Sequence, residues 1–248
     1  EVVVQNSLAS ACEKCQQWER SLDTLAEMLL RGPRPDVITF NSAISACKTG
    51  LQWRCPVHLF VMAQQRAVFS DTVGCNAAMS ACERTLQWSE AVLFLTKAAR
   101  CSLQADVITY NCAASACSKC SEWAPALGLL GEVSASGVRP DTVTSSAVLA
   151  ACRSRGLWRA ACSLLAELSR CGQELQTTAC NAVLGALERA GEWALALRRL
   201  GELRRTGPRP DAVGYAAVAA ASLAAGRPPR GLLGALHGHV AGIFGTSG

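Results

Sequence analysis

The 35 residues 107–141 read VITYNCAASACSKCSEWAPALGLLGEVSASGVRPD, and the whole chain is built on this pattern. The stretch contains one of the six tryptophans of the protein, and each tryptophan lies 35 residues after the one before it: Trp18, Trp53, Trp88, Trp123, Trp158 and Trp193. A strict period of this length is typical of solenoids, in which a small unit is stacked many times and buries its apolar face on its neighbours. The sequence therefore predicts a stack of repeats.

A recurring aspartate marks the same phase as the tryptophans and closes five of the units: Asp36, Asp71, Asp106, Asp141 and Asp211. We therefore expect six repeats without insertion, at 2–36, 37–71, 72–106, 107–141, 142–176 and 177–211. A degenerate seventh repeat, serving as a cap with a flexible tail, is expected at 212–248 because its Gly-rich end lacks the pattern. These units are numbered repeats 1 to 7 below.

Each repeat contains two stretches with helical periodicity. In repeat 2 the apolar residues at positions 4, 7, 8 and 11 follow the i, i+3, i+4, i+7 spacing of one helical face. A second such stretch starts at the tryptophan, and Gly137 and Pro140 illustrate the residues that end it. Each repeat is thus predicted to be a helical hairpin.

Composition agrees with closely packed helices. Half of the 248 residues are apolar, aromatics are only 5%, and Ala and Leu favour helix over strand. No apolar run approaches the roughly 20 residues that a membrane span needs, so we expect no membrane association. The net charge of +5 is mild for a nucleic-acid-binding protein.

The motifs VITFN at 37–41 and VITYN at 107–111 open two repeats, and RPD closes three, at 34–36, 139–141 and 209–211. In a 35-residue helical hairpin these motifs resemble the pentatricopeptide repeat family. Tetratricopeptide repeats have a period of 34 and a Trp early in their first helix, whereas here Trp opens the second. The resemblance implies an all-α fold, a right-handed α-solenoid of stacked helix-turn-helix repeats, with no cofactor.

The resemblance also implies binding of single-stranded RNA, with one base read per repeat. In this family the base-reading positions correspond to positions 5 and 35 of the repeat. The residues at these positions are Asn6 with Asp36, Asn41 with Asp71, Asn76 with Asp106, Asn111 with Asp141, Ser146 with Gln176, and Asn181 with Asp211. The Asn and Asp combination implies a preference for uracil, with cytosine second.

An aliphatic residue at position 2 is implied to sandwich the base, and it is present in the first five repeats: Val3, Ile38, Val73, Ile108 and Val143. Four consecutive repeats are thus expected to read a short uridine run. Repeat 5 has neither Asn nor Asp at the reading positions, so the base that it would read is not assigned. Repeat 6 has Thr178 in place of the aliphatic residue. In repeat 7, Ala216 has no side chain able to read a base.

A purely structural role is the alternative for these polar residues. An Asn early in a helix and an Asp just before the next one can cap or turn the backbone. The recurrence of both together in five of six repeats favours RNA reading, because the carboxamide offers a donor and an acceptor that a neighbouring carboxylate can orient. The two roles can coexist.

Every full repeat also has a cation at position 12 or 13: Lys14, Lys48, Arg84, Lys119, Arg153 and Arg189. We interpret them as phosphate-binding residues, because a stripe of cations beside the base readers suits an RNA backbone. Cations also favour helix C-termini for electrostatic reasons alone, so that alternative stays open.

No enzymatic or metal site is expected. The pairs Cys12 with Cys15 and Cys117 with Cys120 have C-x-x-C spacing, but the first cysteine of each lies at position 11, a core position of the repeat. The three histidines lack further ligands nearby, and phosphate loops, nucleophile elbows and zinc-deaminase signatures are absent from the sequence. Catalysis would have to come from a protein partner or another segment.

The sequence thus predicts a monomeric, sequence-selective RNA-binding protein acting in RNA processing, editing, stability or translation. The resemblance implies a mitochondrion or chloroplast as its location. One alternative is a helical-repeat scaffold for protein–protein interaction, and another is the guide portion of a larger RNA-processing enzyme. The chain starts at Glu1 and reads as an excerpt of a longer protein.

Overall fold

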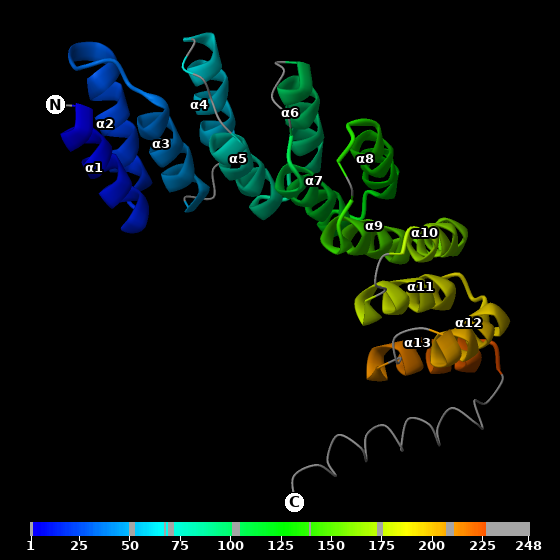
Figure 1. Ribbon diagram of the computed structural model, residues 1–248. Coiled ribbons are helices and arrows are strands. Elements are labelled where there is room, and N and C mark those ends of the chain that lie inside the picture. Colours follow the sequence, from blue (N-terminus) through cyan, green and yellow to red (C-terminus); the bar gives the residue numbers. More distant parts are fainter. Residues whose placement is uncertain are drawn as a thin grey trace, which may run out of the picture. The chain divides into compact units, whose positions relative to one another are not determined.

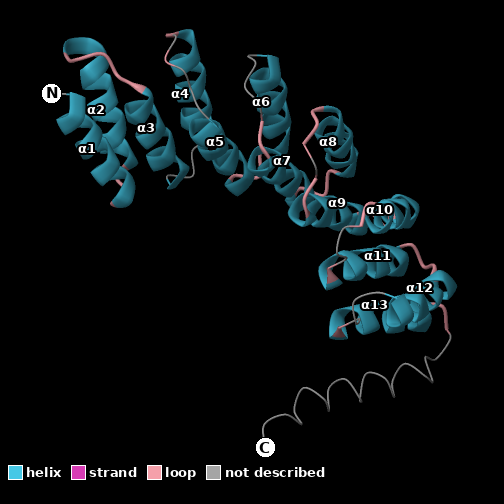
Figure 2. Cartoon of the chain, in the orientation of Figure 1, coloured by secondary structure: helices cyan, strands magenta, loops and turns pink. Residues whose placement is uncertain are grey.

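The computed structural model describes residues 2–49, 53–66, 68, 72–100, 105–138, 140–172, 176–206 and 211–226 (Figure 1). Within these ranges the chain forms thirteen α-helices and no strand (Figure 2). The all-α prediction is therefore confirmed. The chain divides into two compact units, residues 1–120 with 131–139 and residues 121–130 with 140–248, which we describe separately.

The first unit contains two rows of helices. Its members are α1 (Val2–Lys14), α2 (Trp18–Arg31), α3 (Val37–Thr49), α4 (Arg54–Gln65), α5 (Thr72–Arg84), α6 (Trp88–Arg100) and α7 (Val107–Lys119). The odd-numbered helices pack each against the next and form the first row, whereas α2, α4 and α6 each contact the odd-numbered helices on either side (Figure 1). This is the arrangement of stacked helical hairpins.

The second unit repeats the arrangement with α9 (Thr142–Ser154), α10 (Trp158–Arg170), α11 (Thr177–Arg189), α12 (Trp193–Thr206) and α13 (Ala212–Ala224). Here α11 packs between α9 and α13, and α10 and α12 form the second row. The boundary between the units runs through α8 (Trp123–Ala135).

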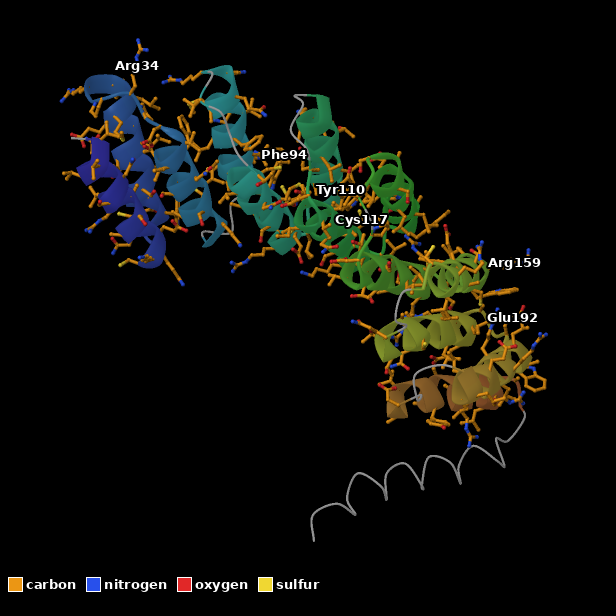
Figure 3. All side chains as sticks on the ribbon, viewed as in Figure 1. Arg34, Phe94, Tyr110, Cys117, Arg159 and Glu192 are labelled. Atoms are coloured by element: carbon orange, nitrogen blue, oxygen red, sulfur yellow. The ribbon has the colours of Figure 1, made fainter. Side chains whose placement is uncertain are left out.

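Small residues allow the first-row helices to approach closely. Ala43, Ala78 and Ala113, at position 7 of three consecutive repeats, are completely buried. Cys117 is buried one turn further along α7, and Tyr110 lies on the same helix (Figure 3). The cysteines predicted at the core position are all buried: Cys12, Cys47, Cys82, Cys117 and Cys152.

The turn between the two helices of a repeat uses the left-handed backbone region at position 15. Gly156, Gly191 and Gly226 have φ between 67° and 74° there, as suits glycine. Gln16, Leu86 and Ser121 adopt φ of 58° to 61° at the same position despite carrying side chains. The turn conformation is therefore set by the repeat and not by glycine alone.

Candidate nucleic-acid interface

The asparagine and aspartate of a repeat meet in space, although they are 30 residues apart in the sequence. Asn6 Nδ2 donates a hydrogen bond to Asp36 Oδ2 at 2.9 Å, and Asn76 Nδ2 donates to Asp106 Oδ2 at the same distance. In the second unit the Asn181 amide donates to Asp211 at 3.0 Å. The helical hairpin brings the pair together because it returns the chain to the start of its own first helix. The predicted reading positions are therefore adjacent in repeats 1, 3 and 6.

The same aspartates cap the next first-row helix. Oδ1 of Asp36 accepts a hydrogen bond from the backbone N–H of Thr39, and Oδ1 of Asp106 accepts one from Thr109, each at 2.9 Å. Asp141 Oδ1 accepts in the same way from Thr144 N at 2.8 Å. One carboxylate thus performs both roles considered from the sequence, with one oxygen on the helix and the other on the asparagine.

These contacts favour the ionised carboxylates. Burial by itself raises the pKa of Asp36 and Asp106. Hydrogen bonds from the backbone N–H of the capped threonine and from the asparagine side chain outweigh it, so the pKa of both groups lies below its ordinary value. Both groups therefore carry a full negative charge at neutral pH.

A threonine completes the cluster, and the sequence analysis assigned it no role. Thr39 Oγ1, at position 3 of repeat 2, lies 2.6 Å from Oδ1 of Asn6 and donates to it. Thr109 Oγ1, at position 3 of repeat 4, bonds Oδ1 of Asn76 at the same distance. The signal was present as the Thr of the VIT motif, but its partner lies 33 residues away in the preceding repeat.

The predicted base-sandwiching residues are exposed aliphatic side chains. Their exposed fractions are 76% for Val3, 59% for Ile38, 61% for Val73, 57% for Ile108 and 55% for Val143. Each lies three residues before position 5 of its repeat, so the two side chains share one face of the first-row helix. In repeats 1 to 4 this sets an apolar surface beside the amide. Asn6, Asn41, Asn76 and Asn111 are themselves partly exposed.

The remaining predicted reading positions differ from this pattern. Asp71 lies outside the described residues. Asn181 is only 8% exposed, and its Oδ1 is buried without a hydrogen-bond partner. Ser146 is partly exposed, and Gln176 precedes α11 without capping it. Thr178 is exposed and lies 3.4 Å from the Gln176 side-chain oxygen.

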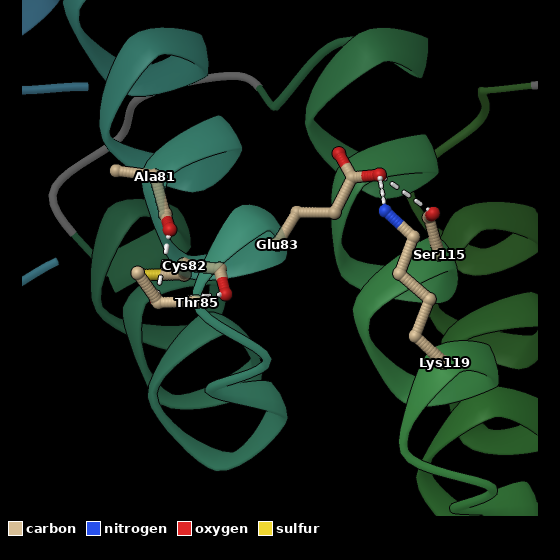
Figure 4. A network of polar contacts seen from close by, with 6 residues as sticks. All are labelled: Ala81, Cys82, Glu83, Thr85, Ser115 and Lys119. Carbon is tan, nitrogen blue, oxygen red and sulfur yellow. Dashed lines mark hydrogen bonds and ion pairs between the residues drawn. The ribbon is translucent and has the colours of Figure 1, made fainter. Parts of the chain in front are cut away.

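The predicted phosphate-binding cations all lie in the last turn of first-row helices, at the opposite end from the asparagines. Lys48 is partly exposed, and the others are exposed: Lys14, Arg84, Lys119, Arg153 and Arg189. Lys119 and Arg189 also bond protein groups, and the Arg153 side chain lies against Gly185. Lys119 Nζ forms an ion pair with Glu83 at 2.9 Å, and Ser115 donates to the same carboxylate (Figure 4). Arg189 Nη1 donates to the backbone oxygen of Ser154 at 2.9 Å.

The cysteine pairs do not assemble into a larger ligand set. Among the residues that the structure describes, no three His, Cys, Asp or Glu side chains lie close enough to hold a metal ion. Burial raises the pKa of the Cys47 thiol to about 12, which makes it unreactive at neutral pH. In the same ranges no helix has the length and apolar character needed to cross a membrane.

Solved structures of helical-repeat proteins match this arrangement, whereas no family model and no curated protein sequence matches the chain. The pentatricopeptide repeat protein PPR10, solved in complex with an 18-nucleotide psaJ RNA element, has a TM-score of 0.70 at 27% identity over 89% of this chain. The chain has the repeat fold of pentatricopeptide repeat proteins.

Two further solved structures support the same fold. PPR10 from maize matches with a TM-score of 0.65 at 24% identity over 89% of the chain. The repeat domain of Arabidopsis thaliana protein-only RNase P 1, solved with tRNA, has a TM-score of 0.60 at 13% identity over 72% of the chain and 94% of that domain. The present chain spans only about a third of PPR10, 32% of its length.

Proposed function

We propose that the protein binds single-stranded RNA with one base per repeat and a preference for uridine and other pyrimidines. The observation that carries this proposal is the recurring cluster of an oriented asparagine amide beside an exposed aliphatic side chain, as at Asn6 with Val3 and Asn76 with Val73. The RNA-bound structure of PPR10, at 27% identity, supports the same conclusion.

The chemistry of the cluster suits a nucleobase. An asparagine amide offers both a donor and an acceptor to the edge of a base, and an apolar side chain one turn earlier offers a surface for its face. An exposed large aliphatic residue with no partner in the protein is typical of a binding surface when it recurs beside polar groups. Stacked repeats then place such surfaces on successive first-row helices.

The cations supply an attraction that does not depend on sequence. Positions 5 and 13 of a first-row helix are separated by about 12 Å along its axis, so the base edge and a phosphate can be contacted from one helix. We infer that Lys14, Lys48, Arg84 and Arg153 contact the RNA backbone directly. Lys119 can do so only in competition with Glu83.

The direct test is binding to oligouridine and oligoadenosine of equal length, measured by fluorescence anisotropy over a range of salt concentrations. We expect the dissociation constant for oligouridine to be lower by roughly tenfold or more, because several hydrogen-bonded bases each contribute on the order of 1 kcal/mol. Affinity for both should fall with salt. The slope of log association constant against log salt concentration should be about −0.7 for each phosphate contacted. Equal and negligible binding to both would instead favour a protein-binding scaffold.

The biological setting forms part of the proposal. We place the protein in organellar RNA processing, editing, stability or translation, in a mitochondrion or chloroplast, and we propose that it is a monomer without catalytic activity of its own. The match to the repeat domain of an RNase P favours a second candidate, the guide portion of a larger RNA-processing enzyme. In that case protein partners or another segment would supply catalysis.

A further inference from the structure

We infer that Thr39 and Thr109 are positioning residues that fix the orientation of the asparagine amide in the preceding repeat and so set its base selectivity. The inference rests on the proposed RNA binding and assigns a role in it to a third position of the repeat. It concerns repeats 1 and 3, whose asparagines are Asn6 and Asn76.

The cluster defines which end of the amide faces which partner. An ionised carboxylate can only accept hydrogen bonds, so the NH2 end of Asn76 must face Asp106 and its oxygen must face Thr109. The Thr109 hydroxyl has one proton, and its distance of 2.6 Å to Asn76 is shorter than the 2.8 Å to Asp106. We therefore assign the proton to the shorter contact, the one with the asparagine oxygen. Repeat 1 has the same arrangement, with the threonine oxygen 2.6 Å from Asn6 and 2.9 Å from Asp36.

After these two hydrogen bonds, the Asn76 amide still has hydrogen-bonding groups free for a base. Asp106 uses one N–H of Asn76, and Thr109 uses one lone pair of its oxygen, so one donor and one acceptor are left in a fixed order. Along its pairing edge uracil presents an acceptor, a donor and an acceptor, so the order is the same in both directions. The pairing edges of cytosine, adenine and guanine lack this symmetry. An amide held in one orientation therefore discriminates among bases more sharply than one that turns.

Repeat 5 has the same hydroxyl at position 3 in Thr144, whereas repeats 3, 6 and 7 lack it. Gly74 and Gly214 occupy position 3 of repeats 3 and 7, and glycine has no side chain to offer. A Cβ atom at Gly74 would lie 2.5 Å from Oδ1 of Asn41, so this asparagine oxygen takes up space that a side chain would need. Asn181, in the repeat that precedes Gly214, has a buried side-chain oxygen without a hydrogen-bond partner. The array thus contains two kinds of asparagine: some are followed by a threonine at position 3 of the next repeat, as Asn6 and Asn76 are, and others by a glycine, as Asn41 and Asn181 are.

The test uses a uridine oligonucleotide and its single U→C, U→A and U→G replacements at every position, with dissociation constants measured for the whole chain. Asn76→Ala first identifies the nucleotide that repeat 3 contacts. Thr109→Val, which removes only the hydroxyl, should then reduce the preference for U over C at that nucleotide by roughly fivefold, the effect of about one hydrogen bond. Preferences at the other nucleotides should stay within about twofold.

Three variants serve as controls. Thr109→Ser keeps the hydroxyl and should keep the preference. Thr24→Val removes another buried hydroxyl, which bonds only the backbone oxygen of Arg20, and should alter no preference. Thr39→Val should reproduce the effect at a different nucleotide, the one read by repeat 1.

Two outcomes would overturn the inference. If wild-type protein discriminates among bases but Thr109→Val weakens all RNAs alike or none, the threonine is merely structural and the proposed function stands. If the wild-type protein shows no base preference at any position, the proposed function fails and this inference fails with it.

Discussion

At the scale of the residue, one aspartate both caps a helix and holds the asparagine that we propose reads a base. Asp106 caps α7 through one oxygen and holds Asn76 through the other, and Asp36 does the same for α3 and Asn6. The sequence analysis allowed the capping and the orienting roles to coexist. In the structure both contacts are present, because the two oxygens of each carboxylate face different partners.

The lowered pKa of Asp36 and Asp106 predicts a specific pH dependence. A carboxyl group whose pKa is lower in the folded chain stabilises it fully above the ordinary value of 3.8, and this contribution is lost as pH falls through the lowered pKa. We expect the double variant Asp36→Asn, Asp106→Asn to be less stable than wild type at pH 7, with the difference narrowing as the pH falls below 3.8 and through the lowered pKa. Urea unfolding at several pH values measures this. A difference that stays constant with pH would show that these carboxylates are not stabilised by their partners.

At the scale of the element, the hairpin turn imposes a left-handed backbone conformation at position 15, even in repeats that have no glycine there. Leu86 adopts φ of 59° with half of its side chain exposed, which costs a non-glycine residue about 1 kcal/mol. Leu86→Gly should therefore raise the free energy of unfolding by about 0.5 to 1 kcal/mol, measured by urea denaturation.

The matched control is the same turn in repeat 5. Gly156 has φ of 67°, and an added Cβ would meet only ordinary contacts, the nearest at 3.4 Å. Gly156→Ala should thus lower the free energy of unfolding by about 1 kcal/mol through backbone strain alone. Changes of the same sign in both variants would contradict this account of the turn.

At the scale of the whole molecule, the period of the sequence was enough to predict the helices, but contacts between repeats were not predictable from it. Five second-row helices and α8 begin at or next to a tryptophan of the 35-residue series, as α2 does at Trp18. The hydroxyl contact of Thr109 and the ion pair of Lys119 depend on side chains more than 30 residues away. Their distances follow from how one hairpin stacks on the next, which periodicity does not determine.

The burial of Asn181 is a second feature that the repeat pattern did not predict. Its repeat carries the expected Asn and Asp, and the predicted hydrogen bond to Asp211 is present. The Asn181 side chain is nevertheless buried, whereas the asparagines of repeats 1 to 4 are partly exposed, and its oxygen lacks a hydrogen-bond partner. Matching residues at two positions therefore predict the pair but not its accessibility.

The central claim is that each asparagine reads one base, and single-nucleotide binding profiles of three variants test it most directly. Asn6→Thr, Asn41→Thr and Asn76→Thr lie on successive first-row helices of one unit. Each should alter base preference at one nucleotide, and the three nucleotides should be consecutive along the RNA. Variants that change affinity for every sequence equally, or that alter scattered or identical positions, would contradict the claim.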